Sequence, residues 1–175
     1  MSTHHLAVGR TAKGAWMKLS VATVMYLASG GLTIARAQNA AEIRLTPREF
    51  AFDSASAGGP GTSGVSGIRT IVLKGDPTKP GLYTILLRVP AHTRIAAHRH
   101  PDDRIATVVS GTWYFGYGRE FDTARLRPLA VGSFYTEPPD KDHFAETRDT
   151  EVMVQITGVG PTATTYVRAA NDPRP

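Results

Sequence analysis

The 175-residue sequence contains no cysteine. This absence excludes disulfide scaffolds, cysteine-ligated zinc sites, iron–sulfur clusters, thiol catalysis and lipid attachment through a cysteine. Any metal site must therefore use histidine, aspartate or glutamate side chains. The 17 glycines and 12 prolines are too many for a helical bundle and too few for a low-complexity chain. This composition favours a turn-rich β protein.

Acidic residues are missing from the first 41 positions, where Arg10, Lys13, Lys18 and Arg36 lie. From Gln38 onward the chain holds 16 basic and 15 acidic residues, so most of the net charge of +5 belongs to the N-terminal segment. A nucleic-acid-binding surface needs lysine and arginine clustered on one face, whereas here they alternate with acids. We therefore do not expect nucleic acid to be a partner.

A hydrophobic run long enough to cross a membrane is also missing. The apolar stretch at residues 19–35 follows two lysines and contains a Gly-Gly pair and several hydroxyl side chains. It is shorter than the roughly 20 residues that a spanning helix needs. An Ala-Arg-Ala cleavage triplet follows at 35–37, so residues 1–37 predict a signal peptide cleaved near Gln38. The mature protein is then periplasmic or secreted, with no stable membrane anchor; a retained anchor and a start at Met17 are the alternatives.

The rest of the chain consists of short apolar runs separated by turn residues. These runs predict strands at residues 49–52, 68–73, 82–89, 105–109, 112–115, 133–136, 152–156 and 164–167. Their regular spacing predicts an all-β jelly roll or small barrel, with one helical turn at 121–126. Residues 38–67 are predicted as an N-terminal arm ending in a flexible Gly/Ser-rich surface loop at 54–67, and residues 68–170 as the barrel domain.

Three histidines form the pattern that carries chemistry. His98 and His100 are two residues apart, so on a strand both imidazoles point to the same face and can reach one ion. His143 follows a later turn. Ala96 is expected on the same face as His98, where its small side chain leaves room beside a metal. These residue types predict one divalent transition metal ion, and Fe, Mn, Cu, Ni, Co and Zn all suit imidazole ligands.

With these histidines the sequence resembles the cupin superfamily. The first cupin motif, built around His-x-His, matches residues 92–111, and the second, built around Pro-x-Gly-x-x-His, matches residues 132–143 with Pro138 in place. The resemblance implies a double-stranded β-helix barrel that forms a homodimer. It also implies a single metal ion held by His98, His100 and His143.

Several positions depart from the motifs. Arg104 stands where cupins usually offer a glutamate ligand, and a guanidinium cannot bind a cation. The site is then either three histidines with open positions, or it takes Asp103 as a fourth ligand. Arg104 itself is expected to pair with Asp102 or a neighbouring acid, or to hold an anionic substrate. Glu137 is a second ligand-binding candidate, as a partner of the histidines or a general base.

Two further departures are turn positions. His92 and Asp140 replace motif glycines, and both residue types tolerate the left-handed backbone conformation that such turns need. His92 is therefore expected to be a solvated turn residue and not a metal ligand.

The function expected from this pattern is that of an exported, metal-binding cupin. It is a small metalloenzyme of oxygenase, isomerase or lyase type that acts on a small oxygen-bearing molecule, with no catalytic residue assigned. The alternative is a non-catalytic cupin that binds a metal or a small ligand in the same pocket.

Overall fold

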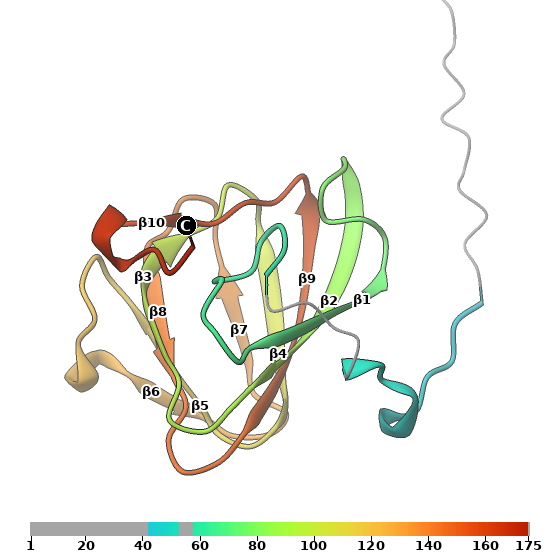
Figure 1. The fold of residues 1–175 in the computed structure, drawn as a ribbon, viewed down its shortest axis with the longest axis horizontal. Helices are drawn as coiled ribbons and strands as arrows, with labels where there is room; N and C mark the ends of the chain where they lie inside the picture. Colours follow the sequence, from blue (N-terminus) through green and yellow to red (C-terminus); the bar gives the residue numbers. More distant parts are fainter. Residues whose placement is uncertain (1–41, 53–57, 175) are drawn as a thin grey trace, which may run out of the picture. The chain divides into compact units, whose positions relative to one another are not determined.

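The computed structural model describes residues 42–52 and 58–174, which excludes the predicted signal peptide at residues 1–37. Two five-stranded sheets face each other (Figure 1), and every pairing between their strands is antiparallel. The first sheet holds, in order, β1 (Arg69–Lys74), β2 (Gly81–Val89), β9 (Val152–Gly160), β4 (Arg104–Ser110) and β7 (Phe134–Glu137). The second holds β10 (Thr165–Tyr166), β3 (Arg94–Arg99), β8 (His143–Glu146), β5 (Trp113–Tyr117) and β6 (Arg127–Leu129).

From β2 onward the chain passes from one sheet to the other at nearly every connection, and only β5 and β6 follow each other within a sheet. This topology confirms the predicted all-β jelly-roll barrel. The predicted helical turn is also present, as the short helix η3 (Thr123–Arg125), because the Asp122 carboxylate caps it by accepting from the amide of Ala124 at 2.9 Å.

The predicted strand ranges need four corrections, one of which is that they omit β3, the strand that holds His98. The strand predicted at residues 49–52 is wrong, because Pro47 and the reciprocal bonds between Thr46 and Glu49 start the short helix η1 (Pro47–Glu49) instead. Strand β6 was not predicted, since Pro128 breaks the pattern; it is tolerated because β6 lies at a sheet edge. Strand β8 was not predicted either, because it contains no β-branched residue.

The register of the first sheet builds the interior as successive layers of inward-pointing side chains. Val89 and Val152 pair at one end, and Leu87, Val154 and Val108 form the next layer. Every one of these side chains is buried. Toward the other end the layers become polar, and that end carries the site described below.

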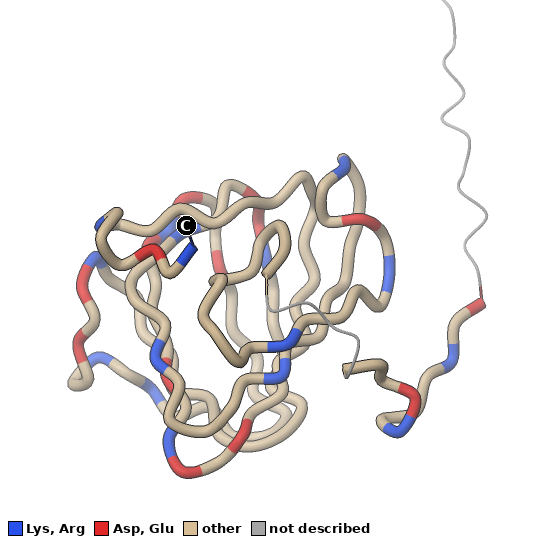
Figure 2. The backbone as a smooth tube through the Cα atoms, in the orientation of Figure 1, with Lys and Arg blue, Asp and Glu red and all other residues tan. Residues whose placement is uncertain are grey.

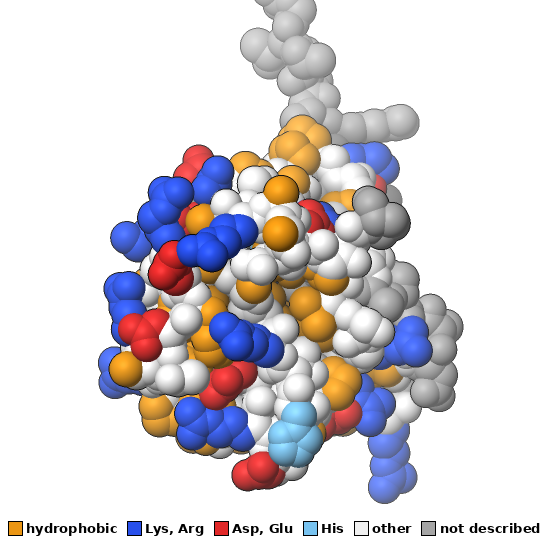
Figure 3. Space-filling view, turned by 60° about the vertical axis from the view of Figure 1, so that its left-hand side comes forward, with side chains coloured by type: hydrophobic (Ala, Val, Ile, Leu, Met, Phe, Trp, Pro, Cys, Tyr) orange, Lys and Arg blue, Asp and Glu red, His pale blue; other side chains and the backbone are white. Residues whose placement is uncertain are grey.

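Charges of both signs are mixed along the described part of the chain. Basic and acidic residues are interspersed along the backbone in Figure 2, and Figure 3 shows arginine and lysine side chains beside acidic ones on one side of the barrel. Among residues 42–52 and 58–174, no helix has the length and apolar character needed to cross a membrane.

Candidate metal centre

Three histidine side chains converge inside the barrel. His98 lies in β3, His100 directly follows that strand, and His143 begins β8, which pairs with β3 so that His98 and His143 are opposite each other. One ring nitrogen from each residue lies within 4.8 Å of the other two, and all three side chains are buried. The expected shared face of His98 and His100 is confirmed. Among the described residues this is the group with the geometry to hold a metal ion.

A β-bulge in β3 places His98. Ile95 pairs with Ala145 and His98 with His143, so two residues of β3, Ala96 and Ala97, lie opposite one residue of β8. The bulge turns Ala96 to the outer surface, where it lines a hollow with Ala97. The prediction that Ala96 lies beside the metal is therefore wrong, and Ile95 lines the cavity instead.

Backbone carbonyl groups fix the orientation of each imidazole. The Nδ1 atoms of His98, His100 and His143 lie 2.8, 2.7 and 2.9 Å from the carbonyl oxygens of Ala96, Ala163 and Lys141. Because a carbonyl can only accept, each Nδ1 carries the proton and donates. The three Nε2 atoms are therefore acceptors with free lone pairs, which is the tautomer that binds a metal through Nε2.

The same histidines are held neutral. Burial lowers the pKa of His98 to about 3, with a further contribution from the neighbouring His143. Burial likewise lowers the pKa of His143 to about 4. The pKa of His100 lies well below its usual value because of burial and the nearby Arg104 guanidinium. At neutral pH all three are uncharged ligands that need no proton loss before metal binding.

Arg104 and Glu137 form a buried ion pair beside the histidines. They are cross-strand partners on β4 and β7, and Arg104 Nε lies 3.0 Å from Glu137 Oε2. The exposed fractions of the two residues are 1% and 4%. Arg104 Nη1 donates to the carbonyl of Gly61 at 2.9 Å. Both predicted ligand-binding candidates thus belong to the site, and the expected neighbouring acid of Arg104 is Glu137.

Asp102 and Asp103 do not take the roles considered for them. Asp102 is buried and accepts hydrogen bonds from the hydroxyls of Tyr83 at 2.7 Å and Thr162 at 2.6 Å, so it is not the partner of Arg104. Asp103 is exposed because alternation along the chain turns it away from the interior. The alternative of Asp103 as a fourth ligand is therefore wrong.

The turn positions behave as expected. His92 and Asp140 both have φ of 56°, the left-handed conformation that a glycine usually supplies. His92 is also exposed, which confirms it as a solvated turn residue.

The histidines open on a small enclosed cavity of about 30 Å³. Its walls combine aromatic and aliphatic side chains with the ion pair, and the residues that line it are Gly61, Ser63, Leu87, Ile95, His98, His100, Arg104, Trp113, Phe115, Tyr135, Glu137, His143, Ala145 and Ile156. Since a water needs at least roughly 10–15 Å³, the cavity has room for about two water-sized ligands.

Residues 58–67 cover this cavity. Gly61 accepts from Arg104, Tyr166 donates its hydroxyl proton to the carbonyl of Ser63 at 2.7 Å, and the segment from Gly61 to Ser63 is buried. The prediction of a surface loop is therefore wrong at these positions, while residues 53–57 lie outside the described part. The Gly- and Ser-rich composition gave no signal of this cover.

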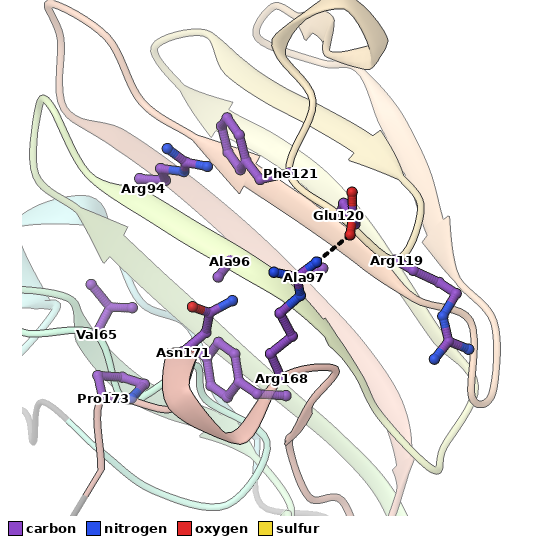
Figure 4. Close-up of a pocket in the computed structure, with 11 residues that line it drawn as sticks. Val65, Arg94, Ala96, Ala97, Arg119, Glu120, Phe121, Arg168, Asn171 and Pro173 are labelled. Atoms are coloured by element: carbon purple, nitrogen blue, oxygen red, sulfur yellow. Dashed lines mark hydrogen bonds and ion pairs between the residues drawn. The ribbon is translucent and has the colours of Figure 1, made fainter.

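A larger hollow of about 640 Å³ lies on the outer face of β3 (Figure 4). Arg94 stacks on Phe121 there, 3.6 Å from its ring centroid, and Arg168 pairs with Glu120 across the hollow. None of the three converging histidines lines it, so the buried cavity is the chemical site.

The resemblance implied a barrel with the histidines of both motifs inside it. The structure has this architecture, since the three histidines face the space between two antiparallel five-stranded sheets. The fold is therefore a double-sheeted jelly-roll barrel. Similar solved structures include salicylate 1,2-dioxygenase from Pseudaminobacter salicylatoxidans, at 15% identity over 58% of this chain and 30% of that one, with a TM-score of 0.48. The chain thus spans less than a third of the dioxygenase.

Two other similar structures are a cupin 2 conserved barrel domain protein from Leptotrichia buccalis and KdgF from Halomonas sp. The first is 17% identical over 54% of this chain and 42% of that one, with a TM-score of 0.46. The second is 18% identical over 55% of this chain and 83% of that one, with a TM-score of 0.45. No family model and no curated protein matches the sequence.

Proposed function

We propose that this protein is a metal-binding cupin in which His98, His100 and His143 hold one divalent transition metal ion. The observation that carries the proposal is the convergence of three neutral imidazoles whose Nε2 atoms are acceptors, since each Nδ1 donates to a carbonyl. In addition, His143 Nε2 is buried and has no hydrogen-bond partner among the described residues. A cation would satisfy this lone pair, so the residues fit a metal ion.

We further propose that the bound metal serves a small metalloenzyme acting on an oxygen-bearing molecule. A divalent transition metal supplies a Lewis acid, or a redox centre if it is iron, copper or manganese. The chain contributes the surroundings: Trp113, Phe115 and Tyr135 exclude bulk water, and Arg104 provides a fixed positive charge that attracts an anionic ligand. Burial and the Glu137 charge raise the pKa of Tyr135 well above its usual value, so its hydroxyl stays protonated.

The metal site is tested by elemental analysis of protein reconstituted with each candidate metal and then desalted. We expect one metal ion per chain in the wild type, and loss of that ion in His98→Ala and in His143→Ala. His92→Asn is the matched control, because His92 is an exposed histidine of the same motif and asparagine tolerates its left-handed backbone. Full metal occupancy in His143→Ala would refute the assignment.

One observation favours the alternative of a non-catalytic binding protein. The cavity has a volume of only about 30 Å³, with Gly61 and Ser63 in its lining, so an organic ring needs more room than this structure provides. An oxygen-uptake screen of the metal-loaded protein with phenolic and keto-acid compounds separates the two functions. Turnover supports the enzyme, whereas metal binding without turnover of any compound supports the binding protein.

Export and dimerisation are also part of the proposal. Export is tested by mass spectrometry of secreted material, which should show a new N-terminus within a few residues of Gln38. A homodimer is supported by exposed apolar residues on the outer face of the first sheet, where Leu82 and Val159 are cross-strand partners and Ile105 and Phe134 are also exposed. Light scattering should give a molar mass of twice that of one chain. In Ile105→Lys the molar mass should fall to that of a single chain.

A further inference from the structure

Three hydrogen-bond acceptors face one another in the cavity. Glu137 Oε2 lies 3.7 Å from His100 Nε2 and 3.8 Å from His143 Nε2. The two imidazoles carry their protons on Nδ1, so neither Nε2 can donate to the carboxylate. Glu137 Oε2 and His143 Nε2 are both buried without a hydrogen-bond partner in the described part of the chain. Such an arrangement is unfavourable unless a positive group lies between the acceptors.

The spacing of these acceptors is that of atoms bound to one ion. Two ligand atoms that each lie about 2.1 Å from a metal are separated by at most about 4.2 Å, and by about 3.4 Å in a tetrahedral site. The two measured distances from Glu137 Oε2, 3.7 and 3.8 Å, fall in this range. The carboxylate therefore needs no large movement to share an ion with His100 and His143.

We infer that Glu137 is a fourth metal ligand, contributed by β7, and that Arg104 positions its carboxylate. This inference rests on the proposed metal site. Arg104 is the cross-strand partner of Glu137, and its Nε lies 3.0 Å from the same oxygen that faces the histidines. The guanidinium cannot rotate away freely, because its Nη1 donates to the carbonyl of Gly61.

The contact between Arg104 and Glu137 leaves the carboxylate able to bind a cation. Although Nε and Oε2 are 3.0 Å apart, neither atom completes a hydrogen bond in this pair. The oxygen thus keeps its lone pairs directed toward the histidines, while the guanidinium holds the carboxylate in place. A carboxylate that served Arg104 alone would instead form the bidentate or aligned contact usual for this pair.

Cobalt(II) is the probe for the test, because its visible spectrum depends on the number and type of its ligands. Affinity is measured by calorimetric titration of the full chain, and the spectrum is recorded at saturation. In Glu137→Gln we expect the Kd for cobalt(II) to rise by at least about tenfold and the spectrum to change. Glu146→Gln is the matched control, because Glu146 lies on β8, the next strand along the chain, and pairs with Arg148 outside the cavity. This variant should leave the Kd and the spectrum unchanged.

A second pair of variants keeps the test decisive if Glu137→Gln does not fold, because that change leaves the Arg104 charge buried and unpaired. Arg104→Met and the double variant Arg104→Met/Glu137→Gln are compared instead, and the double variant should bind cobalt(II) at least about tenfold more weakly than the single one.

An unchanged Kd and spectrum in Glu137→Gln, or equal Kd values in the second pair, would overturn the inference and leave Glu137 only as the partner of Arg104. Failure of the proposed function has a different signature. In that case the wild type takes up no cobalt(II), or His143→Ala binds it as well as the wild type does.

Discussion

The two ends of the barrel interior are equally buried and chemically opposite. At one end Val89, Val152, Val154 and Val108 are at most 1% exposed and contain no polar side-chain atom. At the other end Arg104 is 1% exposed and carries a full charge. The same strands build both ends, since β4 contributes Val108 to one and Arg104 to the other.

The two ends differ in what holds them. The valine end is stabilised by removing apolar surface from water, at about 25 cal/mol per Å². The polar end costs free energy, because three imidazoles and an ion pair leave water and the Nε2 atom of His143 gains no partner in the described part of the chain. Backbone carbonyls hold His98, His100 and His143 in place through Nδ1 regardless of this cost. A buried region that lowers the stability of the fold indicates a function, and the three converging imidazoles fit a metal ion.

Acidification should give the largest effect, and it acts mainly through the buried histidines of the polar end. The pKa values of His98 and His143 are lowered by burial from 6.5 to about 3 and about 4. Between these values and 6.5 the unfolded chain binds protons that the folded protein does not, so the free energy of unfolding decreases as the pH falls below about 6.5. For the metal-free protein we expect Tm to fall by roughly 15–20 °C from pH 7 to pH 4.5.

Circular dichroism melts at several pH values measure this slope. The double variant His98→Gln/His143→Gln removes two of the three histidines with lowered pKa values and should show a clearly smaller decrease in Tm over the same interval. An equal decrease in both proteins would place the acid sensitivity elsewhere in the molecule.

Breaking the buried ion pair should have the next largest effect. In Arg104→Met the carboxylate of Glu137 stays buried without its partner, 4% exposed. We expect the metal-free variant to lose about 3–5 kcal/mol of unfolding free energy. Adding Glu137→Gln should recover most of this loss, because both charges are then gone. Urea denaturation of the two variants checks the prediction, and no recovery in the double variant would contradict it.

Shortening an apolar side chain of the interior should lower the stability of the fold without changing metal binding. Ile85 is 1% exposed and pairs with Ile156 on β9. Ile85→Ala should cost about 3 kcal/mol, through lost burial and the remaining void. The number of metal ions bound per chain should stay at the wild-type value, because Ile85 does not line the histidine cavity, although its partner Ile156 does. A parallel loss of stability and metal would show that the two ends are not separable.

Sequence alone predicted the part of this architecture that depends on local spacing. The His-x-His pair needs only the two-residue period of a strand, and the left-handed turns at His92 and Asp140 need only local backbone preference. The barrel itself follows from short apolar runs between turn residues.

The parts that sequence did not predict depend on pairing between distant segments. The bulge at Ala96 and Ala97 arises from the register of β3 against β8, and two alanines give no local signal of it. The pairing of Arg104 with Glu137 joins residues 33 positions apart and requires the β4–β7 register. The cover at Gly61 has the composition of a surface loop, and only its carbonyl, which accepts from Arg104, ties it to the interior.

The smallest predicted effect concerns Gly158, which lies beside Tyr83 and Arg104 in the polar layer. A Cβ at this position would lie 2.7 Å from both Tyr83 Oη and Asp102 Oδ2, so Gly158→Ala must disturb the hydrogen bond between them. We expect a loss of about 1–3 kcal/mol, the usual cost of overpacking. Gly58→Ala is the control, since no atom lies within 4 Å of its Cβ.

The double variant Gly158→Ala/Tyr83→Phe separates crowding from other effects of the alanine. Tyr83→Phe removes the hydroxyl that the new methyl group would meet, so part of the stability lost in Gly158→Ala should return. Urea denaturation of the single and double variants measures this recovery. The alternative outcome is that the decreases in unfolding free energy of Gly158→Ala and Tyr83→Phe add in the double variant. In that case the Tyr83 hydroxyl does not cause the loss in Gly158→Ala, and the contact of the new methyl group with Asp102 does. Either result identifies which buried polar group, the Tyr83 hydroxyl or the Asp102 carboxylate, leaves no room for a side chain at position 158.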